Sequence, residues 1–404
     1  MSAFLDESTM NSNSSSLQFK TSWFWRMLPA GMRRRWWLFR LFDIVSHHWP
    51  VTGKRKGLLV VRMDGIGDMV LFHQALSVYS NIFRVPNSEI IVLGCKSWGS
   101  IADQIYQGYS LRIIDEHAFS RQPFYRLKIG LMVRKLNVET AICDSYFRRA
   151  MMADSLVWIS AANNTIVSLP FINEPTRPEF TFYLSQVDKV IDTGPYPTHE
   201  VLRHFKFLSN LANRDILPLP PSVPWQEQGQ LVDRSFPYVV LNPGSNEHGR
   251  RWPFESYLNV ANHLLRLGYR VVIVGGQGEH AGNHREMFGE DERVIDLTGK
   301  TSLPELMNIL KFAAGSISND TGPAHLSIAL GTPTVVIVGG GHFGSFVPYP
   351  EQITPPHVRF VYEKMSCYHC FWRCHKRAKK SDVFPCVGAV SEKKVISMIL
   401  EVLP

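Results

Sequence analysis

The sequence predicts an α/β protein made of two doubly wound domains, each with a parallel sheet between layers of helices. Short apolar strands alternate with helix-like stretches along most of the 404 residues, a pattern typical of parallel sheets. A proline-rich stretch at residues 217–224 interrupts this alternation, and the alternation resumes after it. The length and a hydrophobic content of 45% are sufficient for two separate cores.

The first domain is predicted at residues 57–213. Its strands are expected at residues 57–62, 90–93, 111–114, 140–143 and 165–167, and its helices include residues 69–79 and 198–213. The turn after the first strand ends in Gly67-Asp68, which places a carboxylate at the start of a helix. There the helix dipole is expected to lower the pKa of Asp68 and keep it ionised. Asp68 is either a plain helix cap or a carboxylate of a binding cleft, and Asp64 is the fallback candidate for the second role.

The second domain is predicted at residues 236–350, after a linker at residues 214–235. Its strands are expected at residues 238–241, 271–274, 294–297 and 334–337, and its helices at residues 255–267, 303–312 and 324–330. The series Asp320-Thr321-Gly322-Pro323-Ala324-His325 opens the last of these helices. Asp320 or Thr321 can cap it, and Pro323 suits its first turn. The free amides and the positive dipole end of such a helix favour phosphate.

Two further turns follow strands of the second domain. Asn242-Pro243-Gly244-Ser245-Asn246 and Arg250-Arg251-Trp252-Pro253 come after the strand at 238–241, and Gly275-Gly276-Gln277-Gly278-Glu279 follows the strand at 271–274. Ligands of doubly wound domains bind at the carboxyl ends of the strands. Three such turns at strand ends of one domain predict a nucleotide-binding site that faces the first domain across a cleft.

Residues 1–56 are predicted to form an appendage. Residues 20–56 contain nine Lys or Arg and one acidic residue, and residues 23–42 mix arginine with tryptophan and phenylalanine. The apolar runs are too short and too charged for a secretory signal or a spanning helix. A cationic aromatic segment suits an anionic membrane surface, and the alternative is a basic helix packed on the protein itself. No nucleic-acid-binding motif accompanies the segment, so no nucleic-acid partner is expected.

Residues 351–404 are predicted to form a cysteine-rich segment and a C-terminal helix. Four of the six cysteines, Cys367, Cys370, Cys374 and Cys386, fall within twenty residues. Thiols stay reduced in the cytosol, so a site of four thiolates around one zinc or iron ion is predicted. A disulfide, which needs an oxidising compartment, is the alternative.

Together these motifs resemble glycosyltransferase family 9, the family of the ADP-heptose:lipopolysaccharide heptosyltransferases. The resemblance covers residues 57–345, and its most specific part is the series from Asp320 to His325. It implies two facing Rossmann-like domains of the GT-B type, with the donor nucleotide on the second domain and the acceptor on the first. It also implies transfer that inverts the anomeric centre without a divalent metal. The chain departs from the family in its N-terminus, in residues 339–344 and in Arg250, where many members have lysine.

The resemblance implies a role for each motif. Asp68 is the expected catalytic base for an acceptor hydroxyl. The donor nucleotide sugar, ADP-heptose, is expected to contact Ser245, Asn246, Arg250, Glu279, Asp320, Thr321, Gly322 and His325. Some protein heptosyltransferases of the family hold iron in a similar cysteine-rich segment, so the only metal expected here is a structural zinc or iron.

The sequence therefore predicts an inverting glycosyltransferase that transfers a sugar, heptose from ADP-heptose, to a cell-envelope glycan such as lipopolysaccharide. The expected location is the inner face of the cytoplasmic membrane. The alternatives are a non-catalytic nucleotide-sugar-binding protein of the same fold and a protein heptosyltransferase of the autotransporter-modifying type. An epimerase with two facing Rossmann domains is a weaker alternative, because such enzymes lack the series from Asp320 to His325. The acceptor and the oligomeric state stay open.

Overall fold

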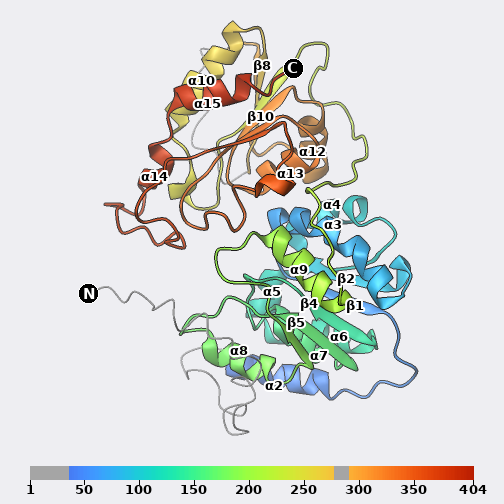
Figure 1. The fold of residues 1–404 in the computed structure, drawn as a ribbon. Coiled ribbons are helices and arrows are strands. Elements are labelled where there is room, and N and C mark those ends of the chain that lie inside the picture. Colours follow the sequence, from blue (N-terminus) through green and yellow to red (C-terminus); the bar gives the residue numbers. More distant parts are fainter. Residues whose placement is uncertain (1–35, 277–290) are drawn as a thin grey trace.

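The fold consists of two six-stranded parallel sheets, each covered by helices (Figure 1). The structure is a computed structural model that describes residues 36–276 and 291–404, with the backbone alone for residues 36–38. The strand orders are β3-β2-β1-β4-β5-β6 and β12-β11-β10-β7-β8-β9. Both are the doubly wound order in which the chain starts at a central strand, winds to one edge and then winds to the other. The predicted fold class is confirmed.

The first domain begins with a helix that precedes its first strand. Its strands are β1 Leu58–Arg62, β2 Ile90–Cys95, β3 Ser110–Ile114, β4 Thr140–Cys143, β5 Asn164–Ser168 and β6 Lys189–Ile191. Its helices are α2 Trp36–His47, α3 Ile66–Phe83, α4 Gly99–Ile105, α5 Glu116–Arg121, α6 Pro123–Lys135, α7 Ala153–Ile159, α8 Arg177–Leu184 and α9 Glu200–Ala212, with short 3-10 helices at Asn87–Glu89 and Lys96–Trp98.

The second domain repeats this alternation. Its strands are β7 Tyr238–Asn242, β8 Arg270–Ile273, β9 Val294–Asp296, β10 Gly315–Asn319, β11 Thr334–Ile337 and β12 Val358–Val361. Its helices are α10 Phe254–Arg266, α12 Leu303–Lys311, α13 Gly322–Ala329, α14 Pro385–Gly388 and α15 Glu392–Leu400, with short 3-10 helices at His248–Arg250 and Glu351–Ile353.

The central strands are buried along their whole length because helices cover both faces of each sheet. Every residue of β1 is buried, and Leu58 pairs in parallel register with Ile90 on one side and Thr140 on the other. In the second sheet, Ile317 of β10 lies opposite Leu241 of β7 and Val335 of β11. Most strands of this kind appear in a sequence as continuous apolar runs, which is why the sequence located most of them.

Helix α2 packs against α6 and α7 of the first domain. The carboxylate of Asp43 accepts two hydrogen bonds of 2.7 Å from buried Arg126 and one of 3.1 Å from the Tyr183 hydroxyl. The end of the predicted appendage is therefore bound to the protein body, while residues 1–35 lie outside the described residues. None of the described helices combines the length and apolarity that a bilayer-crossing segment requires.

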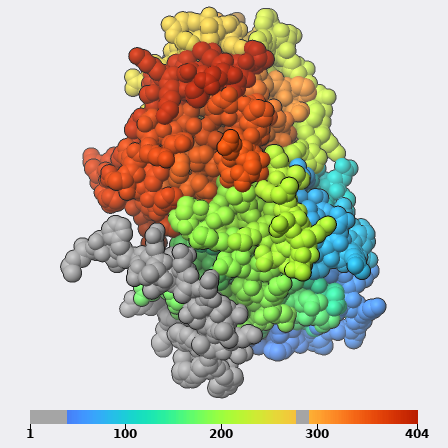
Figure 2. All heavy atoms as spheres, in the orientation of Figure 1, coloured from blue at the N-terminus to red at the C-terminus, as the bar shows by residue number. Residues whose placement is uncertain are grey.

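The two domains are in direct contact. Helices α3 and α9 lie on the side of the first domain that is turned toward the second, and α3 packs against α13 (Figure 1). The orange and red surface of the second domain rests on the green surface of the first (Figure 2). The connecting segment also contacts both parts, because the Ser222 carbonyl lies 2.7 Å from His73 Nδ1 of α3 and the Val223 amide donates to the Ala329 carbonyl of α13.

Candidate functional site

The candidate site lies where the carboxyl ends of the central strands of the two sheets face each other. In each sheet the winding direction changes between two strands, β1 and β4 in the first domain and β7 and β10 in the second. Crevices for ligands form at such switch points. The turn with Asp68 follows β1, and the series from Asp320 to His325 follows β10. The structure therefore places both predicted motifs at switch points.

A buried ionic network fixes the end of β1. Arg62 donates a 2.7 Å hydrogen bond to Asp144 and forms a 3.0 Å ion pair with Asp64. Asp144 also accepts from the Tyr79 hydroxyl at 3.2 Å and pairs with His204 at 2.9 Å. Burial alone would raise the pKa of Asp144, but His204 and Arg62 hold it well below its usual range. Arg62 is therefore bound between two carboxylates and orients the turn that follows it.

Asp68 occupies the third position of α3, after the N-cap Gly65. Its Oδ2 accepts a 3.1 Å hydrogen bond from the Gly65 amide, as in a capping box. Burial, and after it the charge of Asp64, raise the pKa of Asp68 to about 7, against the opposing effects of Arg62 and the Gly65 amide. The expectation of a lowered pKa is therefore wrong, because burial and a second carboxylate outweigh the helix dipole. A carboxyl with this pKa is a much better base near neutral pH.

The N-terminus of α13 presents free amides toward the first domain. Thr321 is its N-cap in extended conformation, and Pro323 lies in its first turn. The Thr321 hydroxyl accepts a 3.0 Å hydrogen bond from the Asn242 side chain and donates to the Asn319 carbonyl. It therefore makes no cap bond to its own helix, so the first amides of α13 stay available for an anion.

Arg250 reaches this helix terminus from the end of β7. Its Nη2 pairs with the Asp320 carboxylate at 3.0 Å and also donates to the Asp320 carbonyl. Its guanidinium lies 4.5 Å from the centre of the Trp372 ring. Arg250 is a quarter exposed, so one cation remains beside the free amides. This is a suitable environment for a diphosphate.

A close contact joins the two motifs. A Cβ atom on Gly67 would lie 2.7 Å from Cδ2 of His325, and one on Gly322 would lie 3.1 Å from Cβ of Ile66. Both glycines therefore allow the turn after β1 to approach the N-terminus of α13. His325 Nδ1 lies 2.7 Å from the Tyr349 hydroxyl, and burial lowers the pKa of His325 to about 4. His325 is thus a neutral imidazole packed against the Asp68 turn.

The remaining residues predicted to contact the donor nucleotide sugar are Ser245, Asn246 and Glu279. Ser245 is buried, and its hydroxyl has no partner among the described residues, whereas Asn246 is exposed. The Ser245 carbonyl accepts two hydrogen bonds from Arg251, which fixes the loop after β7. Glu279 lies outside the described residues.

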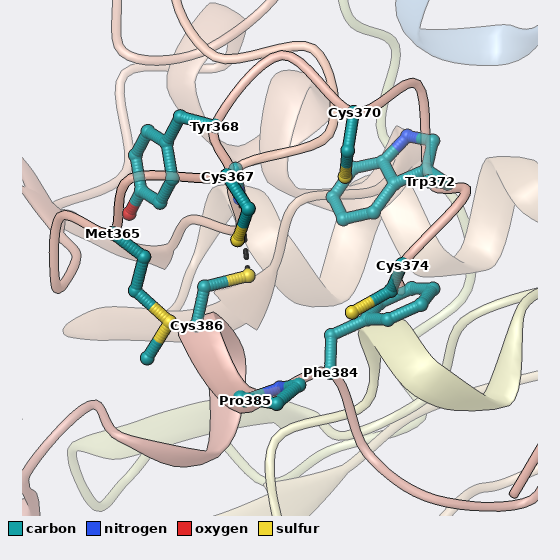
Figure 3. Close-up of a pocket in the computed structure, with 10 residues that line it drawn as sticks. Met365, Cys367, Tyr368, Cys370, Trp372, Cys374, Phe384, Pro385 and Cys386 are labelled. Carbon is teal, nitrogen blue, oxygen red and sulfur yellow. Dashed lines mark hydrogen bonds between the residues drawn. The ribbon is translucent and has the colours of Figure 1, made fainter. Parts of the chain in front are cut away.

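The four cysteines of the C-terminal segment line one small pocket beside β11 and α14. Figure 3 shows the thiols of Cys367, Cys370, Cys374 and Cys386 around a common space. Its free volume of about 10 Å³ corresponds to about one water-sized sphere. The donor set and the size fit a single zinc or iron ion. The geometry is not yet that of a bound ion, because within the described ranges no three candidate ligands lie close enough to hold one.

The cysteine-rich segment packs against the run Gly339-Gly340-Gly341, which follows β11. A Cβ atom on Gly341 would lie 2.2 Å from the Trp372 ring, and one on Gly340 would lie 2.3 Å from the Tyr368 ring. The Gly340 amide is 3.3 Å from Cys386 Sγ, and its carbonyl accepts from the His369 amide at 2.7 Å. The glycines therefore serve the packing of the cysteine-rich segment.

Sequence reasoning missed the network of Arg62, Asp144 and His204. These residues come from a strand, a strand end and a helix interior, and no local motif connects them. The available signal was an arginine at the end of an otherwise apolar strand, since a buried cation requires a buried partner.

Comparison with known proteins gives a consistent result. Residues 184–376 match the family model for glycosyltransferase family 9 (heptosyltransferase). Lipopolysaccharide heptosyltransferase 2 of Salmonella typhimurium is 30% identical over 141 residues, which are 33% of this chain and 38% of that protein. The chain thus matches little more than a third of the length of this curated relative.

Two solved structures have the same fold. The glycosyltransferase family 9 protein of Veillonella parvula superimposes with a TM-score of 0.68 at 19% identity, over 87% of this chain and all of that one. The dodecameric iron-containing heptosyltransferase TibC, in complex with ADP-D-beta-D-heptose, superimposes with a TM-score of 0.53 at 15% identity, over 87% of this chain and 77% of that one.

The family match extends over the linker, the series from Asp320 to His325 and three of the four clustered cysteines. The fold similarity extends beyond these residues, over 87% of this chain. Residues 184–376 are thus similar in sequence to glycosyltransferase family 9, and the chain as a whole has the fold of solved heptosyltransferases.

Proposed function

We propose that the protein is an inverting glycosyltransferase that moves a sugar, heptose from ADP-heptose, onto a cell-envelope glycan such as lipopolysaccharide. One observation carries the proposal. The turn with Asp68 lies directly against the N-terminus of α13, where Gly67 contacts His325 and Gly322 contacts Ile66. Asp68, the proposed base, and the N-terminus of α13, the proposed anion site, thus lie next to each other. Displacement of a diphosphate by a hydroxyl requires both groups at one place.

Asp68 acts as the base in this proposal. Its pKa of about 7 leaves much of the group ionised at neutral pH and able to accept the proton of an attacking hydroxyl. Asp64 is less suited to this role, because its Oδ2 accepts a 2.8 Å hydrogen bond from Ser145 and forms an ion pair with Arg62.

The departing diphosphate is bound by α13 in this proposal. Its negative charge increases as the bond to the sugar breaks, and the free amides at Thr321 and Gly322 stabilise that charge. Arg250 turns from Asp320 to the phosphates when the donor binds. The Ser245 hydroxyl is available as a further donor of hydrogen bonds.

A screen of nucleotide sugars tests the proposal. Purified protein is incubated with ADP-heptose, other ADP-sugars, UDP-sugars and GDP-sugars, and binding and donor hydrolysis are measured. We expect a thermal shift and slow hydrolysis with ADP-heptose. Binding of donor without hydrolysis or transfer in either the wild type or D68N would favour the non-catalytic alternative, because a binding protein has no use for a base at that turn.

The acceptor and the location are part of the proposal. Relatives named as lipopolysaccharide heptosyltransferases favour an acceptor at the inner face of the cytoplasmic membrane. Helix α2 exposes Leu41 and Val45 one turn apart, and the exposed ring of Phe124 lies 6.4 Å from Phe42. Residues 20–35, which precede α2 in the sequence, contain five Lys or Arg. Both features suit peripheral contact with anionic lipid.

A structural ion at the four cysteines completes the proposal. Cys367, Cys370, Cys374 and Cys386 would hold one zinc or iron ion, and the pocket size supports a single ion. Such an ion would cross-link the loop that carries Cys367, Cys370 and Cys374 to Cys386 of α14 and would take no part in the transfer. The iron-containing heptosyltransferase TibC has the same fold, and this keeps a protein acceptor as the second candidate. A parallel assay with an autotransporter passenger protein and with lipopolysaccharide distinguishes the two acceptors.

A further inference from the structure

Glu200, the first residue of α9, is a buried carboxyl group that the mechanism above does not use. Its side chain is only 4% exposed, and its Oε1 atom has no hydrogen-bond partner among the described residues. Burial of a carboxyl group without a partner is costly, and native proteins rarely contain one without a reason. A buried carboxyl oxygen of this kind at the contact between the two domains indicates a missing ligand atom.

Glu200 lies where the two domains meet. Its amide donates a 2.9 Å hydrogen bond to the carbonyl of Ser345 in the loop after β11, and His199 Nε2 lies 2.8 Å from the carbonyl of Phe346. Helix α9 packs on α3, whose first turn contains Asp68 (Figure 1). The start of α9 is therefore held between the catalytic turn and a loop of the donor domain.

The neighbouring arginine does not neutralise Glu200. Arg203 lies one turn further along α9, and its guanidinium donates to the carbonyls of Thr198, Gly194 and Pro195. It also lies 3.5 Å from the centre of the Tyr146 ring. Because these contacts occupy the guanidinium, the carboxyl of Glu200 remains without an ion-pair partner in the described structure.

The other charged groups near Glu200 belong to the turn after β1. Asp68 and Asp64 disfavour its ionisation, and Arg62 and Arg203 favour it. Burial is the largest effect, and the pKa of Glu200 is raised to about 8. At neutral pH the group therefore retains its proton.

We propose that Glu200 is a further substrate-binding residue, which as a neutral acid donates a hydrogen bond to an oxygen of the bound nucleotide sugar. That oxygen is a hydroxyl of the transferred sugar or an oxygen of the diphosphate. The proposal rests on the proposed function, because a donor held at α13 extends toward Asp68 and the start of α9. A neutral acid suits this position, since an ionised carboxylate would repel the diphosphate and oppose the ionisation of Asp68.

The test is the pH dependence of donor affinity in the wild type and in E200Q. Binding of ADP-heptose and of ADP is measured by calorimetry between pH 7.5 and 9.5. If the protonated form of Glu200 binds the donor, the wild-type affinity should fall about tenfold for each pH unit above 8. The amide of E200Q donates without ionising, so its affinity should stay constant. E179Q, which replaces a buried glutamate of α8 far from the cleft, is the matched control and should follow the wild type.

The two probes distinguish the oxygen that is bound. A fall in affinity with ADP alone assigns the contact to the diphosphate, and a fall only with ADP-heptose assigns it to the sugar. An equal loss of affinity in the wild type and in E200Q, or no loss in the wild type, would overturn the proposal. If ADP-heptose does not bind at any pH, the proposed donor is wrong, and the same titration with the nucleotide sugar selected by the screen still tests Glu200.

Discussion

Replacement of Asp68 by asparagine tests the electrostatics of the site and the catalytic role together. In the folded protein the pKa of Asp68 is about 7, whereas an aspartate in an unfolded chain has a pKa of about 4. The folded state therefore binds this proton more tightly. Its contribution to stability is complete below pH 4 and is lost as the pH rises through 7.

The difference between these two pKa values corresponds to about 4 kcal/mol at alkaline pH. Asp68 is partly exposed and shares its surroundings with Asp64, which reduces the expected effect to about 1–3 kcal/mol. Asparagine has no charge to bury, and its side-chain oxygen can still accept from the Gly65 amide. D68N should therefore exceed the wild type in stability by this full amount at pH 8.5 and by only about a third of it at pH 5.

Two assays measure these effects. Urea unfolding of both proteins at pH 5 and pH 8.5 gives the stability difference, and transfer rates between pH 5.5 and 8 give the catalytic one. We expect the wild-type rate to rise through pH 7, and the rate of D68N to be lower by about 10²–10⁴ with unchanged donor affinity. A rate within a few-fold of the wild type would move the base to Asp64 or to no protein group. Equal stabilities at pH 8.5 would refute the raised pKa.

Three further outcomes follow from the structure. R250A should weaken ADP binding by about 1–3 kcal/mol, the range for hydrogen bonds to charged groups, whereas T321V, which keeps the amides of α13, should change it little; unchanged affinity in R250A would remove Arg250 from the phosphate site. Elemental analysis should return one zinc or iron per chain. C370S should lower this metal content, whereas C95S, which replaces a buried cysteine of the core, should not. Metal-free protein from a metal-replete preparation would exclude the site. Deletion of residues 1–35 should release the protein from anionic liposomes without changing its melting temperature, because the cut spares α2 and the pair of Asp43 with Arg126. Flotation of the shortened protein would show that these residues are not the anchor.

Most of the fold could be predicted because buried parallel strands are continuous apolar runs. Strands β4 and β11 lie at the expected residues, 140–143 and 334–337. Strands β6, β10 and β12 were missed because their apolar runs are short or interrupted, and β10 has Ile317 as its single large apolar residue. Lys189–Ile191 has three residues, one of them exposed, and Val358–Val361 includes Arg359. Edge strands need less apolar surface, so their pattern is weaker.

The site could be predicted only where chemistry is local in the chain. Glycine turns and the start of α13 are local signals, and they located Thr321 and Gly322. The pKa of Asp68 is a tertiary property, because burial and Asp64 determine it. The sequence did not single out Glu200, since a glutamate in the first turn of a helix is ordinary. Its proposed role depends on its burial beside the loop of Ser345, which is a tertiary contact.

The cysteine-rich segment is part of the cleft, although its sequence sets it apart from both domains. Trp372 lies against the run Gly339-Gly340-Gly341 and beneath the guanidinium of Arg250. The next ring, Phe371, stacks on Phe171 and Tyr196 of the first domain, with centres 4.8 and 4.9 Å away. Two adjacent aromatic residues between Cys370 and Cys374 thus contact Arg250 on one side and the first domain on the other. An ion at the four thiols would hold both rings, and through them it would hold the contact of this segment with Arg250 and with the first domain.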